Sequence, residues 1–391
     1  MTTGPLDGMR VLDFTTTIAG PYCTRLMADL GAEVIKIETA EGDMMRTRPP
    51  LRGGASTSFG QLNAGKQCIV LDLKRTEAQD IVQRLLTTCD FLVENFRPGV
   101  MQRFNLDYAA VAKRQPALIY CSISGFGQTG PSSSLPAYAP VIHAASGFDL
   151  AHMAYQPGRD RPDNCGIYVA DIVSGTYAFG AIMAAHAQRH LNGLGQHIDV
   201  SMLETMLTLL VGEVQGAQFP VAPPPRPMFG PVKTSDGFIM PAVASEKTFQ
   251  ALCQAAGHAE WITDPRFALY ANRRNNWGDF VDLLETWSGT LTTEACQAAF
   301  DAAGVPGSPY RTVKEVLDDP QLAHRGALAE VHDAGGSFKV VNPPFRLSGA
   351  PVQVAGFASG LGQNTSEVLE LAGYAADEIK KMSDAGIIKL G

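Results

Sequence analysis

Asp171 is the residue whose type and setting most directly suggest chemistry. It lies in Gly166–Gly175 (GIYVADIVSG), where a long helix rich in alanine and glycine is expected to begin. A plain helix-capping aspartate is common, and without further context this structural role is the better interpretation. The start of a helix also favours the ionised carboxylate, which can attack an activated acyl carbon. Asp171 is therefore also a candidate nucleophile.

A second motif, Gly125–Gly130 (GFGQTG), matches the G-x-G-x-x-G pattern of dinucleotide-binding turns and follows an expected strand. In that pattern the last glycine leads into a helix, whereas here Pro131 and three serines follow. The segment therefore predicts a glycine-rich loop at the end of a sheet strand, where α/β folds bind ligands, and no nicotinamide site is expected.

His186 and His190 have a spacing that could place two imidazoles on one metal ion. Ala187 stands where a zincin would have glutamate, and Arg189 between the histidines disfavours a cation. We therefore expect structural or solvent-facing histidines and no metal site. The chain also has no G-x-S-x-G elbow for serine hydrolase chemistry.

The elements that must position Asp171 alternate between strands and helices in the first 125 residues. This alternation predicts an α/β fold with a largely parallel sheet covered on both faces. The expected strands are Met9–Phe14, Glu33–Glu38, Cys68–Leu73, Asp90–Asn95 and Ala117–Ser124, and the expected helices run from Pro21 to Leu30 and from a Thr76 cap to about Cys89.

Domain organisation is indicated by a change of texture near Phe219–Met228 (FPVAPPPRPM), whose five prolines suggest a linker. A hairpin is expected around Ser235-Asp236-Gly237, followed by several helices to about Leu317. Before this segment we expect a helix over Asp171–His190, a strand over Gly195–Val200 and a helix over Met202–Gln215. The sequence predicts a large α/β domain over 1–225, completed by 326–391, and a small α+β domain over 226–325.

Composition sets further limits. The 391 residues are 45% hydrophobic and 18% charged, with a net charge of -8. An acidic chain disfavours nucleic-acid binding, and seven cysteines without a C-x-x-C pair suggest neither a disulfide framework nor a zinc site. No signal peptide or long apolar run is visible, so we expect a cytoplasmic protein that does not span a membrane.

Several blocks together resemble the class III CoA-transferases, the family of formyl-CoA transferase and carnitine CoA-transferase. The similarity runs from near residue 4 to near residue 390, and the order and spacing of the blocks are specific. In chain order they include GPLDGMRVLDF, AGPYCTRLMADLGAEVIKIE, NAGKQCIVLDLK, ENFRPG and YCSISGFGQTGP, with Asp171 in the block that resembles the family's nucleophile segment.

The resemblance implies a Rossmann-like large domain, a small domain and two chains interlocked as a homodimer. It also implies that Asp171 attacks an acyl-CoA thioester to form an aspartyl-acyl anhydride, from which the thioester is remade on an acceptor carboxylic acid. No permanently bound cofactor is expected, because coenzyme A thioester is itself the substrate.

The family's CoA-contacting positions carry over to Ala19, Asn95, Phe96 and Arg103. Ile18 stands where formyl-CoA transferases have a glutamine of the acyl site, and Thr39 stands where arginine is usual. Their run of consecutive glycines is absent from Pro220–Pro231 (PVAPPPRPMFGP). These departures make formate and oxalate unexpected substrates.

Two alternatives remain open. The same family includes α-methylacyl-CoA racemase, which needs a histidine and an aspartate on opposite faces of the substrate. Tyr138 occupies that histidine's place, as in formyl-CoA transferases, and His143 lies five positions further on. A CoA-binding partner subunit is the other alternative, and the retained Asp171 argues against it.

The substrate class is expected to be small dicarboxylic acids of four or five carbons, with succinyl-CoA as donor. Arg46 and Arg48 could clamp a distal carboxylate through bidentate hydrogen bonds, although both could equally be surface arginines. The expected substrate pocket therefore comprises Ile18, Tyr138 and Arg46.

Overall fold

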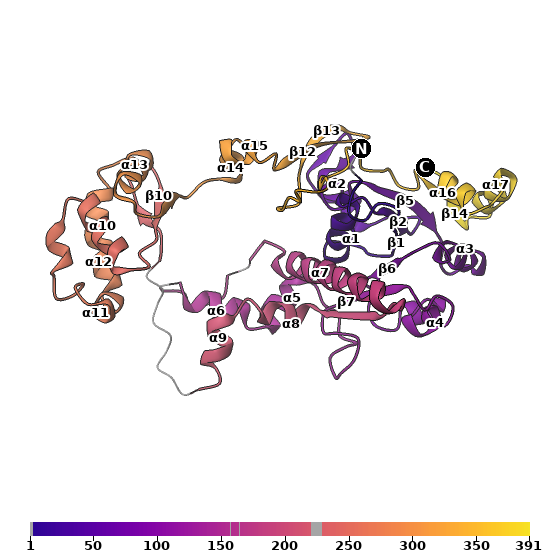
Figure 1. Ribbon diagram of the computed structural model, residues 1–391, viewed down its shortest axis with the longest axis horizontal. Helices are drawn as coiled ribbons and strands as arrows, with labels where there is room; N and C mark the ends of the chain where they lie inside the picture. Colours follow the sequence, from indigo (N-terminus) through magenta and orange to yellow (C-terminus); the bar gives the residue numbers. More distant parts are fainter. Residues whose placement is uncertain (1–2, 157, 164, 220–228) are drawn as a thin grey trace. The chain divides into compact units, whose positions relative to one another are not determined.

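The computed structural model describes residues 3–156, 158–163, 165–219 and 229–391. The chain forms two compact units, and Figure 1 traces both. Unit 1 comprises Met1–Met153, Arg159–Val211 and Ala323–Gly391, and unit 2 comprises Ala154–Gly158 and Gly212–Leu322.

The first boundary falls earlier than the expected residue 225, because the segment expected as one helix over Met202–Gln215 is broken. Helix α8 (Met202–Leu207) ends in a turn, and α9 (Val211–Gly216) follows with all but its first residue in unit 2. The expected proline linker at Phe219–Met228 lies outside the described residues except for Phe219.

A seven-stranded sheet forms the centre of unit 1, in the order β14-β5-β2-β1-β6-β7-β8. Every neighbouring pair is parallel except β14 with β5 at one edge. The predicted α/β class with a largely parallel sheet is therefore confirmed. The strands are β1 (Arg10–Asp13), β2 (Glu33–Glu38), β5 (Lys66–Leu71), β6 (Phe91–Glu94), β7 (Ile119–Ser124), β8 (His197–Ser201) and β14 (Ile388–Lys389).

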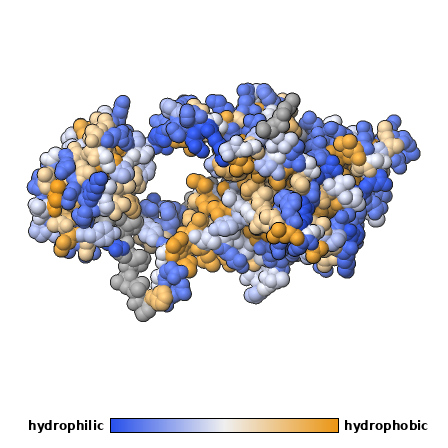
Figure 2. Space-filling view, viewed as in Figure 1, coloured by the Kyte–Doolittle hydropathy of each residue, from blue (hydrophilic) through white to orange (hydrophobic). Residues whose placement is uncertain are grey.

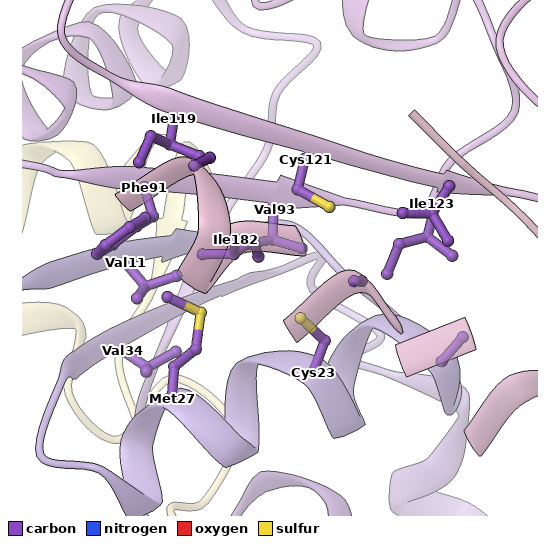
Figure 3. Packing of buried hydrophobic residues seen from close by; sticks show 14 of the residues in the cluster. Val11, Cys23, Met27, Val34, Phe91, Val93, Ile119, Cys121, Ile123 and Ile182 are labelled. Carbon is purple, nitrogen blue, oxygen red and sulfur yellow. The ribbon is translucent and has the colours of Figure 1, made fainter. Parts of the chain in front are cut away.

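Both faces of this sheet are buried. Neighbouring residues of a strand point to opposite faces, so each strand contributes side chains to two cores. Val11 faces a core with Met27 of α1 and Ile182 of α7, whereas Leu12 faces a second core with α3 and α16 (Figure 3). The covering helices are α1 (Ala19–Asp29), α3 (Thr76–Leu86), α4 (Tyr108–Ala112), α5 (Ala139–Ala145), α7 (Val169–Asn192), α16 (Thr365–Leu371) and α17 (Ala376–Asp384).

Local details differ from the sequence expectations at helix starts. Helix α1 begins at Ala19, two residues before Pro21, and Thr76 is the first residue of α3 rather than its cap, which is Arg75. Smaller elements of unit 1 that the sequence did not reveal are η1 (Met44–Thr47), β3 (Leu51–Arg52), β4 (Ala55–Ser56), α2 (Thr57–Asn63), η2 (Met101–Phe104), β12 (Leu328–Asp333) and β13 (Gly336–Val341); α6 (Phe148–Ala154) and α15 (Pro320–His324) cross the unit boundaries.

Unit 2 has its own core, in which Phe249, Phe267, Phe280 and Phe300 have no exposed surface. Its antiparallel sheet has the order β11-β10-β9, and Ser235-Asp236-Gly237 lies in the turn between β9 and β10, as the sequence predicts. The elements are β9 (Val232–Lys233), β10 (Phe238–Pro241), β11 (Gly307–Pro309), α10 (Glu246–Ala255), η3 (Ala259–Ile262), α11 (Tyr270–Asn275), α12 (Trp277–Ser288), α13 (Thr293–Ala303) and α14 (Val313–Leu317).

Across the described ranges, none of the helices combines the length and the apolar character that crossing a bilayer requires.

Candidate active site

A cavity of about 370 Å³ opens in unit 1 where β1, β6 and β7 end. The turns after these strands contribute its walls, with Ala19, Asn95 and Gly125 as examples, and Tyr138 and Asp171 complete it. Ligands of open α/β sheets bind at this edge of the sheet. Five of the eight residues expected at the site, Ala19, Asn95, Phe96, Tyr138 and Asp171, therefore line one cavity.

Asp171 is the third residue of α7, not its N-cap, which is Tyr168. The side chain is largely buried, with 9% of its surface exposed. Burial raises the pKa of Asp171 to about 6, and a hydrogen bond donated by the Ala19 backbone N–H opposes that rise. Because Ala19 is the first residue of α1, the starts of two helices meet at this carboxylate.

Close approach of α7 to α1 depends on a glycine one turn after Asp171. A Cβ added at Gly175 would lie 2.4 Å from the Ala19 carbonyl oxygen, far inside van der Waals contact. Any side chain there would push α7 away from the residue that donates to Asp171. The Gly166–Gly175 segment thus supplies both the carboxylate and the space that it needs.

The turn before α1 is held by a buried ion pair. Asp13, at the end of β1, accepts hydrogen bonds from the Thr15 N–H and hydroxyl and from the Thr24 hydroxyl. Lys66 Nζ lies 3.0 Å from Asp13 Oδ2 and also donates to Asn63 Oδ1. Burial would raise the pKa of Asp13, but the lysines and hydroxyl groups outweigh it and lower the pKa.

A second buried pair, Lys36 with Asp43, continues this network. Lys36 Nζ donates to the Thr15 carbonyl oxygen and lies 3.0 Å from Asp43 Oδ2. Asp43 in turn accepts from the Thr17 N–H at 3.2 Å. Thr17 has a φ of 71°, which is costly for a residue with a branched side chain, so the network holds a strained residue at the cavity wall.

The turn after β6 is tied to the turn after β1 through Asn95. Its Oδ1 accepts from the Thr16 N–H, and its Nδ2 donates to the Thr16 carbonyl oxygen, both at 2.8 Å. Glu94 Oε2 accepts from the Phe96 N–H at 2.8 Å, and burial raises the pKa of Glu94 to about 7. These bonds fix the position of the Phe96 backbone at the cavity.

Three expected site residues do not line this cavity. Ile18 is buried in a hydrophobic cluster with Met45 and Phe59, and Arg103 is exposed on η2. Arg46, expected in the substrate pocket, instead makes a bidentate pair with Glu38, with distances of 2.8 Å and 2.6 Å.

The guanidinium of Arg46 also lies 3.8 Å above the Phe59 ring and donates to the Ser359 carbonyl oxygen. Arg46 lines a separate cavity, so the structure corrects the expectation that it shares the pocket of Asp171. The sequence could not reveal this pairing, because the turn between β2 and η1 brings Arg46 back beside Glu38. Arg48, the other expected clamp, is exposed and is the C-cap residue of η1.

Sequence reasoning assigned no role to Arg97, which is exposed and is the one cationic residue among the described residues of the cavity wall. Arg97 and Pro98 also line a neighbouring cavity of about 290 Å³. The buried lysines were missed too. Their signal is a lysine in a short strand rich in Val, Ile and Leu, since a charge that such a strand buries must find a partner.

His186 and His190 contact each other, with 3.2 Å between their Nε2 atoms, and Arg189 lies 3.1 Å from His186 Nδ1. Within the described ranges, no group of three or more His, Cys, Asp or Glu side chains is arranged to hold a metal ion.

Comparisons with known proteins show what the chain is similar to. The profile of CoA-transferase family III matches residues 6–365. The human succinyl-CoA:glutarate CoA-transferase is 32% identical over 98% of this chain and 90% of its own. The succinyl-CoA–D-citramalate CoA-transferase of Chloroflexus aurantiacus is 34% identical over 98% of both chains. A crystal structure of a CaiB/BaiF family protein from Brucella suis, 30% identical, superimposes with a TM-score of 0.84 over 95% of this chain and all of its own.

Proposed function

The chain belongs to CoA-transferase family III, and from this premise we propose that it transfers coenzyme A between small dicarboxylic acids with Asp171 as the nucleophile. The observation that carries the proposal is a largely buried carboxylate in the wall of a cavity, at the meeting point of two helix starts. A desolvated carboxylate with an acyl group beside it is a competent nucleophile.

In the proposed reaction the ionised Asp171 attacks the thioester carbonyl of the donor, the C–S bond breaks, and CoA thiolate leaves. The resulting aspartyl-acyl anhydride is attacked by the thiolate at the aspartyl carbonyl, which releases the donor acid and gives an aspartyl-CoA thioester. The acceptor carboxylate displaces the thiolate again, and attack of the thiolate on the new acyl carbonyl restores Asp171. Each step exchanges one activated acyl group for another, so no energy source is needed.

Binding of coenzyme A is proposed for the walls formed by Ala19, Asn95 and Phe96. Arg97 fits a phosphate of the cofactor portion, because its exposed guanidinium borders both neighbouring cavities. Both donor groups of the Arg46 guanidinium that face Glu38 are already paired with its carboxylate, so Arg46 is not proposed to bind the distal carboxylate of the substrate.

Small dicarboxylic acids are proposed as substrates because two similar enzymes are named for succinyl-CoA with glutarate and with D-citramalate. Tyr138 belongs to the proposed acyl pocket, since it lines the cavity and is mostly exposed there.

A homodimer is proposed as the working form. The apolar helix α7 exposes Tyr177 and Leu191, the latter with 88% of its surface. Figure 2 shows hydrophobic residues gathered on the surface of unit 1 in the region of α5, α7 and α8. The family resemblance implies a second copy of the chain as partner, and we propose that it covers this surface.

The test is a screen of purified protein with succinyl-CoA and a panel of acceptors that includes glutarate, D-citramalate and butyrate, with thioester products resolved by mass. We expect glutaryl-CoA or another dicarboxylyl-CoA to form and butyryl-CoA to form slowly. The Asp171→Ala variant should form neither. Full transfer by that variant would exclude Asp171 as nucleophile, and a preference for butyrate would exclude the dicarboxylate class.

The racemase alternative predicts exchange of the α-proton without any acceptor acid. His143, the histidine available for such chemistry, does not line the cavity. In deuterated water the transferase should therefore add no deuterium to the α-carbon of a bound acyl-CoA at a rate comparable with transfer. Rapid exchange without acceptor would favour the racemase.

A further inference from the structure

Helix α7 begins without a capping side chain of its own, although Asp171 lies in its first turn. Its N-cap residue, Tyr168, makes no side-chain hydrogen bond to the helix. The first N–H groups of a helix have no partner within it, so they need acceptors from elsewhere. The N–H of Ala170, directly before Asp171, finds its acceptor on another helix.

That acceptor is His143 of α5, whose Nε2 lies 3.1 Å from the Ala170 nitrogen. The imidazole is buried, with 2% of the residue exposed, and it does not line the cavity. We propose that His143 is a positioning residue for CoA transfer, because its ring fixes the start of α7 and hence the direction of the Asp171 carboxylate. This inference rests on the proposed role of Asp171 as nucleophile.

The bond specifies one form of the ring. Because Nε2 accepts a hydrogen bond, it carries the lone pair, so the proton of the neutral imidazole is on Nδ1. Burial lowers the pKa of His143, and the negative charge of Asp149 on α6 opposes this only in part. The other acidic groups in the first turns of the helices packed against α5 are Asp171 on α7 and Glu204 on α8. The Phe148 ring, 5.4 Å away between centroids, packs against the imidazole.

Water cannot replace this acceptor, because Ala170 has no exposed surface. Without His143 the N–H of Ala170 would be left unpaired, or the first turn of α7 would have to move. One turn later, Gly175 is held in close contact with the Ala19 carbonyl oxygen. Asp171 lies between these two fixed points, so loss of the first changes its approach to the thioester.

The experiment measures the burst of succinate released when full-length protein is mixed with succinyl-CoA without an acceptor, since CoA stays on Asp171 as the thioester. The amplitude counts competent sites, and the rate reports attack by Asp171. In His143→Leu, which keeps bulk but has no acceptor, the rate should fall about 100-fold, because small misplacements of reacting groups have effects of this size. The amplitude per folded protein and the affinity for CoA should change little.

His143→Gln supplies the decisive comparison. The amide oxygen can accept the Ala170 hydrogen bond without titrating, so this variant should regain most of the lost rate. His190→Leu is the matched control, because it makes the same substitution at the exposed far end of α7. Its burst rate should equal that of the wild type.

The outcomes separate this inference from the proposed function. If Asp171→Ala gives no burst and His143→Leu bursts at the wild-type rate, Asp171 remains the nucleophile and the role of His143 is overturned. If His143→Gln is as slow as His143→Leu, hydrogen-bond acceptance is not what matters, and the inference also fails. A normal burst in Asp171→Ala would instead reject the proposed function. If His143→Leu does not fold, the rate of His143→Gln decides alone.

Discussion

The turn that precedes α1 and the start of α7 meet at Asp171, but different interactions hold them. Buried ions hold the first: Lys66 pairs with Asp13 and Lys36 with Asp43, and these groups make hydrogen bonds to Thr15 and Thr17. Close packing holds the second, where small residues let α7 lie against α1 and a single neutral histidine accepts one backbone N–H.

The difference indicates which substitutions the turn before α1 and the start of α7 can each accept. A buried ion pair contributes little net stability, but removing one partner leaves an uncompensated charge. A closely packed glycine is insensitive to charge and sensitive to added volume. We therefore expect that deleting a charge destabilises the turn before α1, whereas adding an atom destabilises the packing at the start of α7.

The largest effect on stability is expected for Lys66→Met. This change leaves the fully buried Asp13 without its principal cation and should lower the free energy of unfolding by about 3–5 kcal/mol. Urea unfolding followed by circular dichroism measures it. The double variant Asp13→Asn/Lys66→Met should lose less than the sum of the single losses, and strict additivity would show that the two residues do not interact.

Asp171→Asn should stabilise the protein at neutral pH. The folded-state pKa of about 6 lies above the ordinary aspartate value of 3.8, so the native state binds the proton more tightly than the unfolded state. The protonated carboxyl group therefore adds to the free energy of unfolding at acid pH, and this added stability is lost as the pH rises from about 3.8 to about 6. Above this window the variant should be more stable by up to about 3 kcal/mol, and below it the two proteins should be alike.

Activity should change across the same window in the opposite sense. Wild-type kcat/KM should fall as pH falls through about 6, because the nucleophile becomes protonated. Melting and rate profiles over pH measure both effects. An Asp171→Asn variant that is less stable than wild type at pH 8 would contradict the desolvation argument.

Gly175→Ala tests the packed side. The added Cβ would overlap the Ala19 carbonyl oxygen, so we expect a loss of about 1–3 kcal/mol in unfolding free energy and a fall in kcat. Gly180→Ala is the matched control on the same helix, where an added Cβ meets nothing within 4 Å. It should stabilise the helix by about 0.5–1 kcal/mol. Equal effects at the two positions would remove the steric argument.

The smallest effect is expected at the strained residue. Thr17→Gly relieves a left-handed conformation, and this relief should offset the added flexibility of the unfolded chain to within about 1 kcal/mol. Thr16→Gly, at a position with no positive φ, should lose about 1 kcal/mol. Denaturant midpoints compare them, and equal losses would mean that Thr17 is not strained.

Much of unit 1 could be predicted because its strands are short apolar runs between turn residues. Glu33–Glu38 has the bounds that the sequence indicates, since Gly31 precedes it and polar residues follow. The break between α8 and α9 could not be predicted, because residues 208–210 (TLL) contain neither glycine nor proline. Apolar periodicity alone does not mark such a turn.

In the candidate site, too, some residues could be predicted from the sequence and others could not. Asp171, Asn95 and Tyr138 could be found because each lies in a recognisable block of sequence. The bond from Ala170 to His143 spans 27 positions, and the pairing of Arg46 with Glu38 depends on how η1 folds back on β2. Long-range partners of this kind depend on tertiary packing, which a local pattern does not record.

The central claim is that Asp171 carries the acyl group, and oxygen exchange tests it most directly. If glutarate labelled with ¹⁸O in its carboxylates attacks the aspartyl-CoA thioester, the anhydride oxygen remains on Asp171 when glutaryl-CoA leaves. After turnover with succinyl-CoA, mass spectrometry of the peptide that contains Asp171 should show ¹⁸O in that side chain and in no other carboxylate. Rapid formation of glutaryl-CoA with no label on Asp171 would contradict the account.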